Sequence, residues 1–163
     1  MASIALALLA ACAREPSEAE KRAAAERAIA QVEAVQKQKP PPRMLAPHPI
    51  LFADIDRHGL YGAHCAFAPG DSMGAVLLAR DKDAYMKIAG QMVRFASDPG
   101  SARMPLGAWS RYTGRELAVA LTRAEAKGTP GPSDGNRWDG HLTVTDAFDQ
   151  VVYDADGLVQ CNS

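Results

Sequence analysis

The side chains best suited to chemistry in this sequence are its three cysteines, Cys12, Cys65 and Cys161. A thiolate is a nucleophile and a metal ligand, and two thiols can join in a disulfide. An odd number of cysteines in an exported protein leaves one of them for a separate role. Whether the chain is exported therefore decides how its cysteines are used.

Other metal-ligating side chains gather near Cys65, because His58 and His64 follow Asp54 and Asp56. Strong zinc motifs place their ligands about two to four residues apart in two clusters, and this spacing does not match them. We therefore interpret the two histidines as surface residues near the end of a short helix. We expect no bound metal and no cofactor.

A second pattern, Asp-Ala-Asp-Gly at residues 154–157, resembles the start of a calcium-binding loop. The sequence supplies neither the third oxygen ligand nor the glutamate at the twelfth position of such a loop. Asp-Gly is also typical of turns. We expect a turn here that precedes the last strand.

A catalytic arrangement is suggested only by Asp139 and His141, which a strand would place on one face as an orienting carboxylate and a base. No Gly-x-Ser-x-Gly motif occurs, and no serine or cysteine has a recognisable catalytic partner. Without a nucleophile we expect no catalytic residues. An envelope hydrolase or a metal-dependent enzyme is the alternative from a different functional class.

Aromatic and arginine side chains lie beside several of the predicted loops. They are Trp109, Arg111, Tyr112, Arg115, Arg137 and Trp138. Trp, Tyr and Arg are enriched at protein-binding surfaces, whereas packing at a sheet edge is the ordinary structural use of Trp. We take Trp109, Arg111, Tyr112 and Trp138 as a candidate partner surface.

The elements that would position these residues begin with an uncharged apolar run, residues 4–11, that leads directly to Cys12. The run is far shorter than the roughly 20 residues that span a bilayer, and it fits the apolar region of a signal peptide. The motif Leu9-Ala10-Ala11-Cys12 resembles the lipobox of bacterial lipoproteins. The resemblance implies cleavage before the cysteine and a membrane anchor of acyl chains on its sulfur and new amino group.

The residues after the cysteine indicate where such a lipoprotein would be sorted. Ala13 and Arg14 follow it, and neither is the aspartate that commonly retains lipoproteins in the inner membrane. With residues 1–11 as the signal peptide, the resemblance implies a protein anchored by lipid to the periplasmic side of the outer membrane. The membrane is then its first partner.

Residues 12–49 are predicted to form a tether. Ser17 and Glu20 fit a capping box, and residues 19–38 contain strong helix formers with no Gly or Pro. The apolar stripe of this helix is narrow, so the helix has little to bury and is expected to be a solvated spacer. Prolines between residues 40 and 49 end the helix and keep the following segment extended.

Residues 50–163 are predicted to form a β-rich domain of ordinary globular composition, since the chain is 47% hydrophobic and 23% charged. Short alternating segments are separated by turns about every ten residues. Residues 85–95 alternate on both sides of a turn at 89–91, and a second hairpin is expected around residues 146–150. We predict a mainly β fold, a small antiparallel sandwich or barrel preceded by the N-terminal spacer helix.

Cys65 and Cys161 are the cysteines that remain once Cys12 is assigned to the lipid. Cys65 lies on the first expected strand and Cys161 ends the last one. In an oxidising compartment we expect them to form a disulfide. The bridge would close a loop of about 95 residues, which a chain-entropy treatment values at about 4 to 5 kcal/mol.

The domain looks like the small β-domains of uncharacterised envelope lipoproteins of proteobacteria, along residues 61–67, 84–90 and 159–161. Its size, its anchor, its terminal cysteine pair and the Gly-Ser-Ala-Arg segment at 100–103 are also similar to membrane-bound lysozyme inhibitors. We predict a non-enzymatic cell-envelope lipoprotein, a binding or structural module with an envelope protein as candidate partner. An inhibitor of a cell-wall hydrolase is the alternative. The net charge of −1 gives no reason to expect nucleic acid as a partner.

Overall fold

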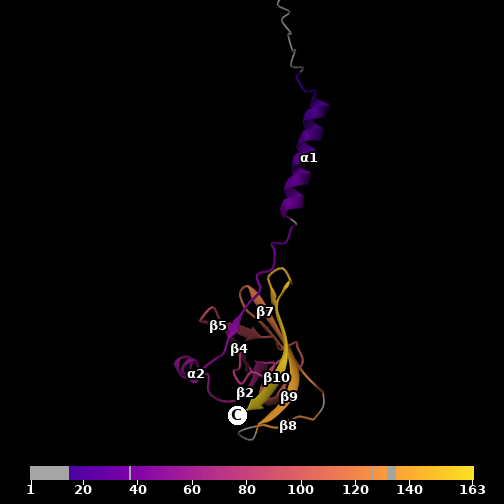
Figure 1. The fold of residues 1–163 in the computed structure, drawn as a ribbon. Coiled ribbons are helices and arrows are strands. Elements are labelled where there is room, and N and C mark those ends of the chain that lie inside the picture. The colour runs from indigo at the N-terminus through magenta and orange to yellow at the C-terminus, as the bar shows by residue number, and fades with distance from the viewer. Residues whose placement is uncertain (1–14, 37, 126, 132–134) are drawn as a thin grey trace, which may run out of the picture. The chain divides into compact units, whose positions relative to one another are not determined.

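The computed structural model describes residues 15–36, 38–125, 127–131 and 135–163. It divides the chain into two compact units, Met1–Pro40 and Pro41–Ser163 (Figure 1). The predicted signal peptide and Cys12 lie outside the described residues. Among the residues that are described, no helix is long and apolar enough to cross a membrane.

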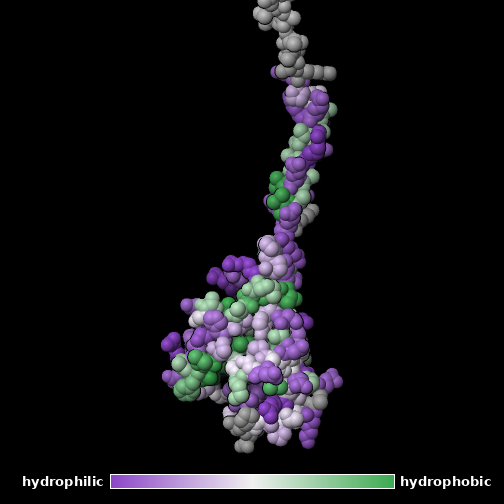
Figure 2. Space-filling view, viewed as in Figure 1, coloured by the Kyte–Doolittle hydropathy of each residue, from purple (hydrophilic) through white to green (hydrophobic). Residues whose placement is uncertain are grey.

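The first unit contains helix α1, Glu18–Gln36, which begins at the predicted capping box. The Ser17 amide donates to Glu20 Oε2 over 2.7 Å, and the Glu20 amide donates to Ser17 Oγ over 3.3 Å. These hydrogen bonds with Ser17 lower the pKa of Glu20. No residue of α1 is buried, and its surface in Figure 2 alternates between hydrophilic and hydrophobic side chains. Both the helix and its capping box are confirmed.

The second unit is a closed antiparallel barrel. Its strands in the described residues are β1 Pro47–His48, β2 His64–Pro69, β3 Leu77–Ala79, β4 Asp83–Ile88, β5 Gln91–Ser97, β6 Arg111–Thr113, β7 Leu117–Arg123, β8 Thr129–Pro130, β9 Asn136–Asp146 and β10 Val151–Asn162. Eight of them close the ring in the order β2-β3-β4-β5-β6-β7-β9-β10, with β10 returning to β2. β1 adds to β4, and β8 adds to β9. The predicted mainly β fold is confirmed, and between sandwich and barrel it is a barrel.

The interior of the barrel is filled by alternate side chains of the strands, as an inward-facing period of two requires. Its fully buried aromatic side chains include Phe67, Phe95 and Tyr112. The aliphatic core includes Leu77, Met86, Leu121, Leu142, Val144 and Val159. The predicted hairpin at 85–95 is the β4–β5 pair, with its turn at Ala89 and Gly90.

Helix α2, Phe52–His58, covers the outside of the barrel beside β4 (Figure 1). Asp54 accepts from the Leu51 amide over 2.9 Å, which caps the helix, and from Lys87 Nζ over 2.8 Å. The Lys87 hydrogen bond is the main reason that the pKa of Asp54 lies below its usual value. The helix ends at Gly59, whose φ of 62° is left-handed. The helix expected before Gly59 is therefore present, and an ion pair ties it to the sheet.

The chain joins the barrel at one end, which we call the tether end. The compact unit starts at Pro41, earlier than the boundary near residue 49 that the sequence suggested. The Leu45 amide donates to the Val152 carbonyl over 2.7 Å, and Pro47 pairs with Ile88. The turns between β4 and β5 and between β9 and β10 lie at this end.

The opposite end, which we call the disulfide end, carries the Cys65–Cys161 bridge. The two cysteines face each other across β2 and β10, and the predicted disulfide is confirmed. Asn136 of β9 pairs with Cys161, and Ala79 of β3 pairs with Cys65. The loops between β3 and β4, between β5 and β6, and between β7 and β9 therefore belong to this end.

The prediction of a turn at residues 154–157 is wrong, because β10 continues without a break through these residues. Gly157 lies directly opposite Gly140 in β9. A Cβ on Gly157 would overlap the carbonyl oxygen of Ala68, and a Cβ on Gly140 would overlap Val159. The glycine after Asp156 thus serves a close approach of strands rather than a turn.

Candidate functional site

The indole of Trp138 is the centre of the strongest candidate site. Trp138 lies near the start of β9, opposite Val159 of β10, and is half-buried. The guanidinium of Arg123 lies over its ring, with Cζ 4.9 Å from the ring centroid. Gly128 packs so closely against the indole that a Cβ there would overlap it. The end of β7 and the connection that follows it therefore both pack against the ring.

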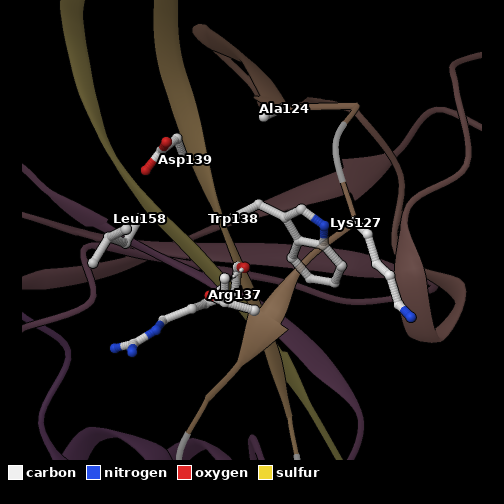
Figure 3. Close-up of a pocket in the computed structure, with 7 residues that line it drawn as sticks. Ala124, Lys127, Arg137, Trp138, Asp139 and Leu158 are labelled. Carbon is white, nitrogen blue, oxygen red and sulfur yellow. Dashed lines mark hydrogen bonds between the residues drawn. The ribbon is translucent and has the colours of Figure 1, made fainter.

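Two cavities flank Trp138 at the disulfide end. The first, of about 230 Å³, is lined by Ala124, Lys127, Thr129, Arg137, Trp138, Asp139 and Leu158 (Figure 3). The second, of about 270 Å³, is lined by Arg123, Glu125, Lys127, Gly128, Asn136 and Trp138. We call the two together the Trp138 groove. Each is smaller than the roughly 300 to 1,000 Å³ of drug-sized ligand sites and suits a single side chain.

The Trp138 groove contains two cations that form no ion pair with the carboxylates of its lining, Asp139 and Glu125. Lys127 lines both cavities and Arg137 lines the first. Within the described ranges, neither side chain forms an ion pair or a side-chain hydrogen bond. Figure 3 shows the Arg137 side chain directed away from Lys127 and from the indole, so each cation would meet an anionic group of a partner separately.

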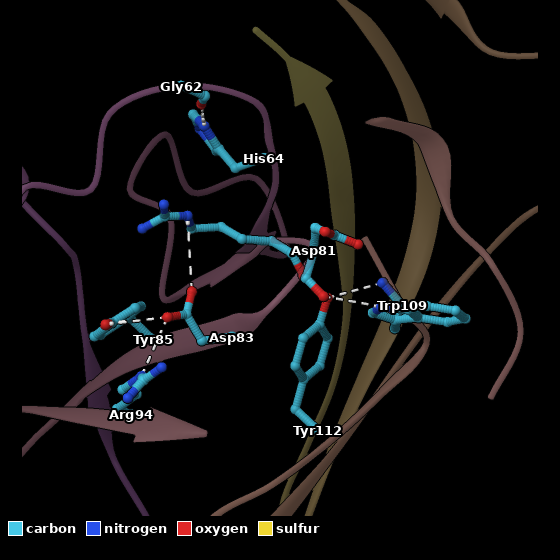
Figure 4. A network of polar contacts seen from close by, with 9 residues as sticks. Gly62, His64, Asp81, Asp83, Tyr85, Arg94, Trp109 and Tyr112 are labelled. Carbon is cyan, nitrogen blue, oxygen red and sulfur yellow. Dashed lines mark hydrogen bonds and ion pairs between the residues drawn. The ribbon is translucent and has the colours of Figure 1, made fainter. Parts of the chain in front are cut away.

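Trp109, the other tryptophan, is held by the protein itself (Figure 4). Its Nε1 donates to the Asp81 carbonyl over 2.9 Å, and Arg103 Cζ lies 4.1 Å from its ring centroid. Arg103 in turn pairs with the Asp81 carboxylate at 3.3 Å and donates to the Gly107 carbonyl at 2.9 Å. Each of these groups therefore has a partner in the β3–β4 loop or in the β5–β6 loop.

Tyr112, one of the residues expected at a partner surface, belongs to the core instead. Its hydroxyl accepts from the Trp109 amide over 2.8 Å and donates to the Arg80 carbonyl over 2.7 Å (Figure 4). Burial raises the pKa of Tyr112 to about 12. The reason is its place on β6, where strand alternation turns Tyr112 inward and leaves Arg111 exposed.

The four residues of the candidate surface are thus separated by the fold. Trp138 lines the groove, Arg111 is exposed on β6, and Trp109 is packed by Arg103. Arg137, which the sequence placed near them, lies in the first cavity. Neither Lys127 nor Arg123 was expected in the site. Lys127 lies in a segment whose only sequence signal is its Gly- and Pro-rich composition, and Arg123 is the last residue of β7, whose pairing with β9 brings it to Trp138.

The histidine considered as a base, His141, does not pair with Asp139. Its Nδ1 lies 2.8 Å from Asp156 Oδ1, and its Nε2 lies 3.0 Å from Asp154 Oδ2. Directly opposed residues of paired strands lie closer together than residues two apart on one strand. These hydrogen bonds, first to Asp156 and then to Asp154, raise the pKa of His141. A neutral imidazole has one N–H, so two carboxylate partners favour the doubly protonated ring.

The residues considered as metal ligands are dispersed. His64 Nδ1 lies 2.7 Å from the Gly62 carbonyl, Asp56 accepts from the Tyr61 hydroxyl, and Cys65 is in the disulfide. In the part of the chain that the structure describes, no group of three or more His, Cys, Asp or Glu could hold a metal ion. The chemistry available at the Trp138 groove is therefore that of binding.

No family model, no curated protein and no solved structure matches this chain. The fold and the site define a small, disulfide-linked, closed antiparallel β-barrel with a cationic, tryptophan-centred groove at one end.

Proposed function

We propose that the protein is a non-enzymatic binding module of the cell envelope, anchored by lipid on Cys12 to the periplasmic side of the outer membrane. Its partner is an envelope protein that docks at the Trp138 groove. The observation that carries the proposal is the pair of adjoining cavities that are both lined by Trp138 and Lys127. Aromatic rings and cations in small pockets are the usual energetic centres of protein interfaces.

The position of the groove supports this function. The chain joins the barrel at the tether end, where Leu45 bonds to Val152, and Trp138 lies toward the disulfide end. A lipid anchor on Cys12 acts on the barrel through its point of attachment at Pro41. The groove therefore lies at the end of the barrel away from that attachment.

The anchor is tested by labelling growing cells with a palmitate analogue. We expect the wild-type protein to incorporate the label and the Cys12→Ser variant to incorporate none. The variant changes no residue of the barrel, so its folding serves as an internal control. Absence of label in both proteins would refute the anchor and the location together.

The partner surface is tested by photo-crosslinking in cells. A photo-crosslinking residue is placed at the exposed position of Thr129 in the groove or, as a matched control, at the exposed position of Glu116 in the turn between β6 and β7. We expect a discrete crosslinked protein from position 129, none from position 116, and loss of the product in Trp138→Ala. Equal products from both positions would contradict a binding site at the groove.

Inhibition of a cell-wall hydrolase is a second candidate, supported by the Gly100–Arg103 segment between β5 and β6. This segment lies at the disulfide end, and Ser101 Oγ accepts from the Arg111 amide over 3.2 Å. Arg103 is immobilised over Trp109 although its side chain is 59% exposed. A rigid loop with a presented arginine suits insertion into an enzyme cleft. We expect slower lysis of cell-wall substrate by lysozyme, and an unchanged rate would remove this candidate.

A further inference from the structure

Three exposed apolar side chains, Met44, Phe148 and Val151, lie at the tether end of the barrel, and we call them the tether-end patch. Met44 is 69% exposed, and Phe148 and Val151 are each 46% exposed. The hydrogen bond from the Leu45 amide to the Val152 carbonyl places the chain at Met44 against the start of β10, where Val151 lies. Figure 2 shows hydrophobic surface on the barrel at this end. Grouped apolar surface of this kind marks contact with a protein or a membrane.

The turn between β9 and β10 holds Phe148 at its tip. The Asp146 carboxylate accepts from the Phe148 amide over 2.8 Å and from the Gln150 amide over 2.9 Å. The Asp149 amide donates to the Asp146 carbonyl over 3.1 Å. These hydrogen bonds fix the turn in advance, so little backbone entropy is lost when Phe148 enters an apolar phase.

The exposed charges around the patch balance one another. The turn between β6 and β7 also lies at the tether end, because the start of β7 pairs with the end of β9. Segment 41–46 and the three turns at this end expose two arginines, Arg43 and Arg115, and two carboxylates, Glu116 and Asp149. A patch without net charge suits a zwitterionic phospholipid surface, which binds through buried apolar area rather than through charge.

The lipid anchor favours a membrane over a protein as the occupant. Residues 13–40 join Cys12 to Pro41, so a bilayer that holds a lipid on Cys12 stays within reach of the tether end. Contact between two parts that are already joined has a high effective concentration, and a weak affinity is then sufficient. The disulfide end has no such link, although Leu106 of the β5–β6 loop is as exposed as Phe148.

We propose that the tether-end patch docks on the phospholipid surface in which Cys12 is anchored, an inference that rests on the lipid anchor of the proposed function. Met44, Phe148 and Val151 enter the boundary between headgroups and acyl chains. Arg43 lies beside them at the level of the lipid phosphates. The barrel then stands on its tether end, and its disulfide end with the Trp138 groove is directed away from the membrane.

The test couples the full chain through the Cys12 thiol to maleimide lipids in phosphatidylcholine vesicles. Cys65 and Cys161 are joined in the disulfide and do not compete for the maleimide. A photo-crosslinking residue replaces Phe148 or, as the matched control, Leu106, because both side chains are 46% exposed. Mass spectrometry measures the fraction of protein that carries covalently bound phosphatidylcholine. We expect about tenfold more of this adduct from position 148, because only that position reaches the acyl chains.

Polar substitutions of similar size assign the contact to the patch. Met44→Gln combined with Val151→Thr should lower the adduct from position 148 about fivefold, because polar groups resist transfer out of water. Leu106→Gln is the control and should leave this adduct unchanged. All three side chains are exposed, so folding is preserved, which circular dichroism checks. Added salt should have little effect, because the patch has no net charge.

Other outcomes would overturn the inference. Equal adducts from positions 148 and 106 would mean that the barrel has no preferred orientation on the membrane, and no adduct from either would mean that it stays clear of the surface. A larger adduct from position 52 on α2, where Leu51 and Phe52 are also exposed, would mean that the barrel lies on its side.

The vesicle experiment is independent of the proposed function, because the maleimide lipid supplies the anchor. Palmitate label in cells without an adduct from position 148 would remove the docking and leave the lipoprotein. Absence of label in cells would remove the anchor and, with it, the docking.

Discussion

The two tryptophans of this barrel both lie under an arginine at the disulfide end, yet their surroundings differ. Around Trp109, every polar group is paired: Arg103 with Asp81, the indole N–H with a carbonyl, and the backbone amide with Tyr112. Around Trp138, the indole is flanked by cavities whose cations have no carboxylate partner in the described residues. The first arrangement completes the fold, and the second is open to a partner.

The comparison teaches that composition alone does not identify a binding site. Arg–Trp stacking occurs in both regions, with Cζ-to-centroid distances of 4.1 and 4.9 Å. What differs is whether the protein itself supplies the counter-charge and fills the adjacent volume. A group that is already satisfied gains little from a new partner, whereas an unpaired cation beside a cavity can gain a charge-assisted hydrogen bond.

The largest expected effect is the difference in stability and partner binding between the alanine variants of Trp109 and Trp138. Trp109→Ala should lower the free energy of unfolding by about 3 kcal/mol, because it removes core packing and the hydrogen bond to Asp81. Trp138→Ala also removes an indole that packs against the barrel core, but the described residues give this indole no hydrogen bond, so it should cost somewhat less, about 2 kcal/mol, and abolish partner crosslinking at position 129. Urea unfolding and the crosslinking assay measure both quantities. Equal stability losses with retained crosslinking in Trp138→Ala would break the comparison.

The next effect tests how Tyr112 fixes the Trp109 region. The pKa of Tyr112 is about 12 in the folded barrel, against 10.0 for an ordinary tyrosine. Since folding favours the neutral phenol, the buried Tyr112 contributes to the free energy of unfolding, and this contribution is fully present below about pH 10. It is lost as the pH rises to about 12, by about 2 to 3 kcal/mol.

Substitution of Tyr112 supplies the control. Tyr112→Phe should remove this alkaline loss and cost about 1 to 2 kcal/mol at pH 7, because the Trp109 amide loses its partner. Unfolding measured by circular dichroism from pH 8 to 12 would show both changes. An identical pH profile in the variant would mean that another group causes the alkaline loss.

Local signals allowed much of this fold to be predicted. The capping box at Ser17 and Glu20, the helix before Gly59 and the hairpin around Ala89 each depend on neighbours within a few residues. The disulfide of Cys161 could be predicted because the lipobox-like motif assigns Cys12 to a lipid anchor and leaves two cysteines to pair. These features depend on contacts between residues that are close in the sequence and on the number of cysteines.

Closure of the barrel and the site depend on long-range pairing. The ring closes because β10 pairs with β2 and β4 pairs with β5. A sandwich built from the same strands would show the same alternation of buried and exposed residues, so the sequence pattern does not distinguish the two folds. The Asp-Gly pair at 156–157 is typical of a turn, so the sequence did not predict that β10 is unbroken there. For the same reason it did not predict that Asp154 and Asp156 lie beside His141. Lys127 enters the site through a connection whose course no periodicity fixes.

A smaller effect tests whether charge or volume distinguishes the two Arg–Trp stacks. Asp81→Asn removes the carboxylate that pairs with Arg103 and should cost only about 0.2 to 1 kcal/mol, because both side chains are exposed. Urea unfolding measures this loss. A loss as large as that of Trp109→Ala would show that the ion pair between Asp81 and Arg103, rather than packing of the indole, holds this region together.

The smallest expected effect tests whether the two faces of β9 act independently. His141 lies on the face opposite Trp138, between Asp156 and Asp154, and its pKa is raised above 6.5. The stability that it contributes is fully present below about pH 6.5 and is lost as the pH rises through the folded-state pKa. In an NMR titration, Asp156→Asn should lower this pKa more than Asp154→Asn does, because Asp156 is the larger cause. The indole N–H signal of Trp138 should stay constant through the titration. If this signal instead shifts with the pKa of His141, protonation on the opposite face of β9 alters the Trp138 groove. The difference between the surroundings of Trp109 and Trp138 would then depend on pH as well as on packing.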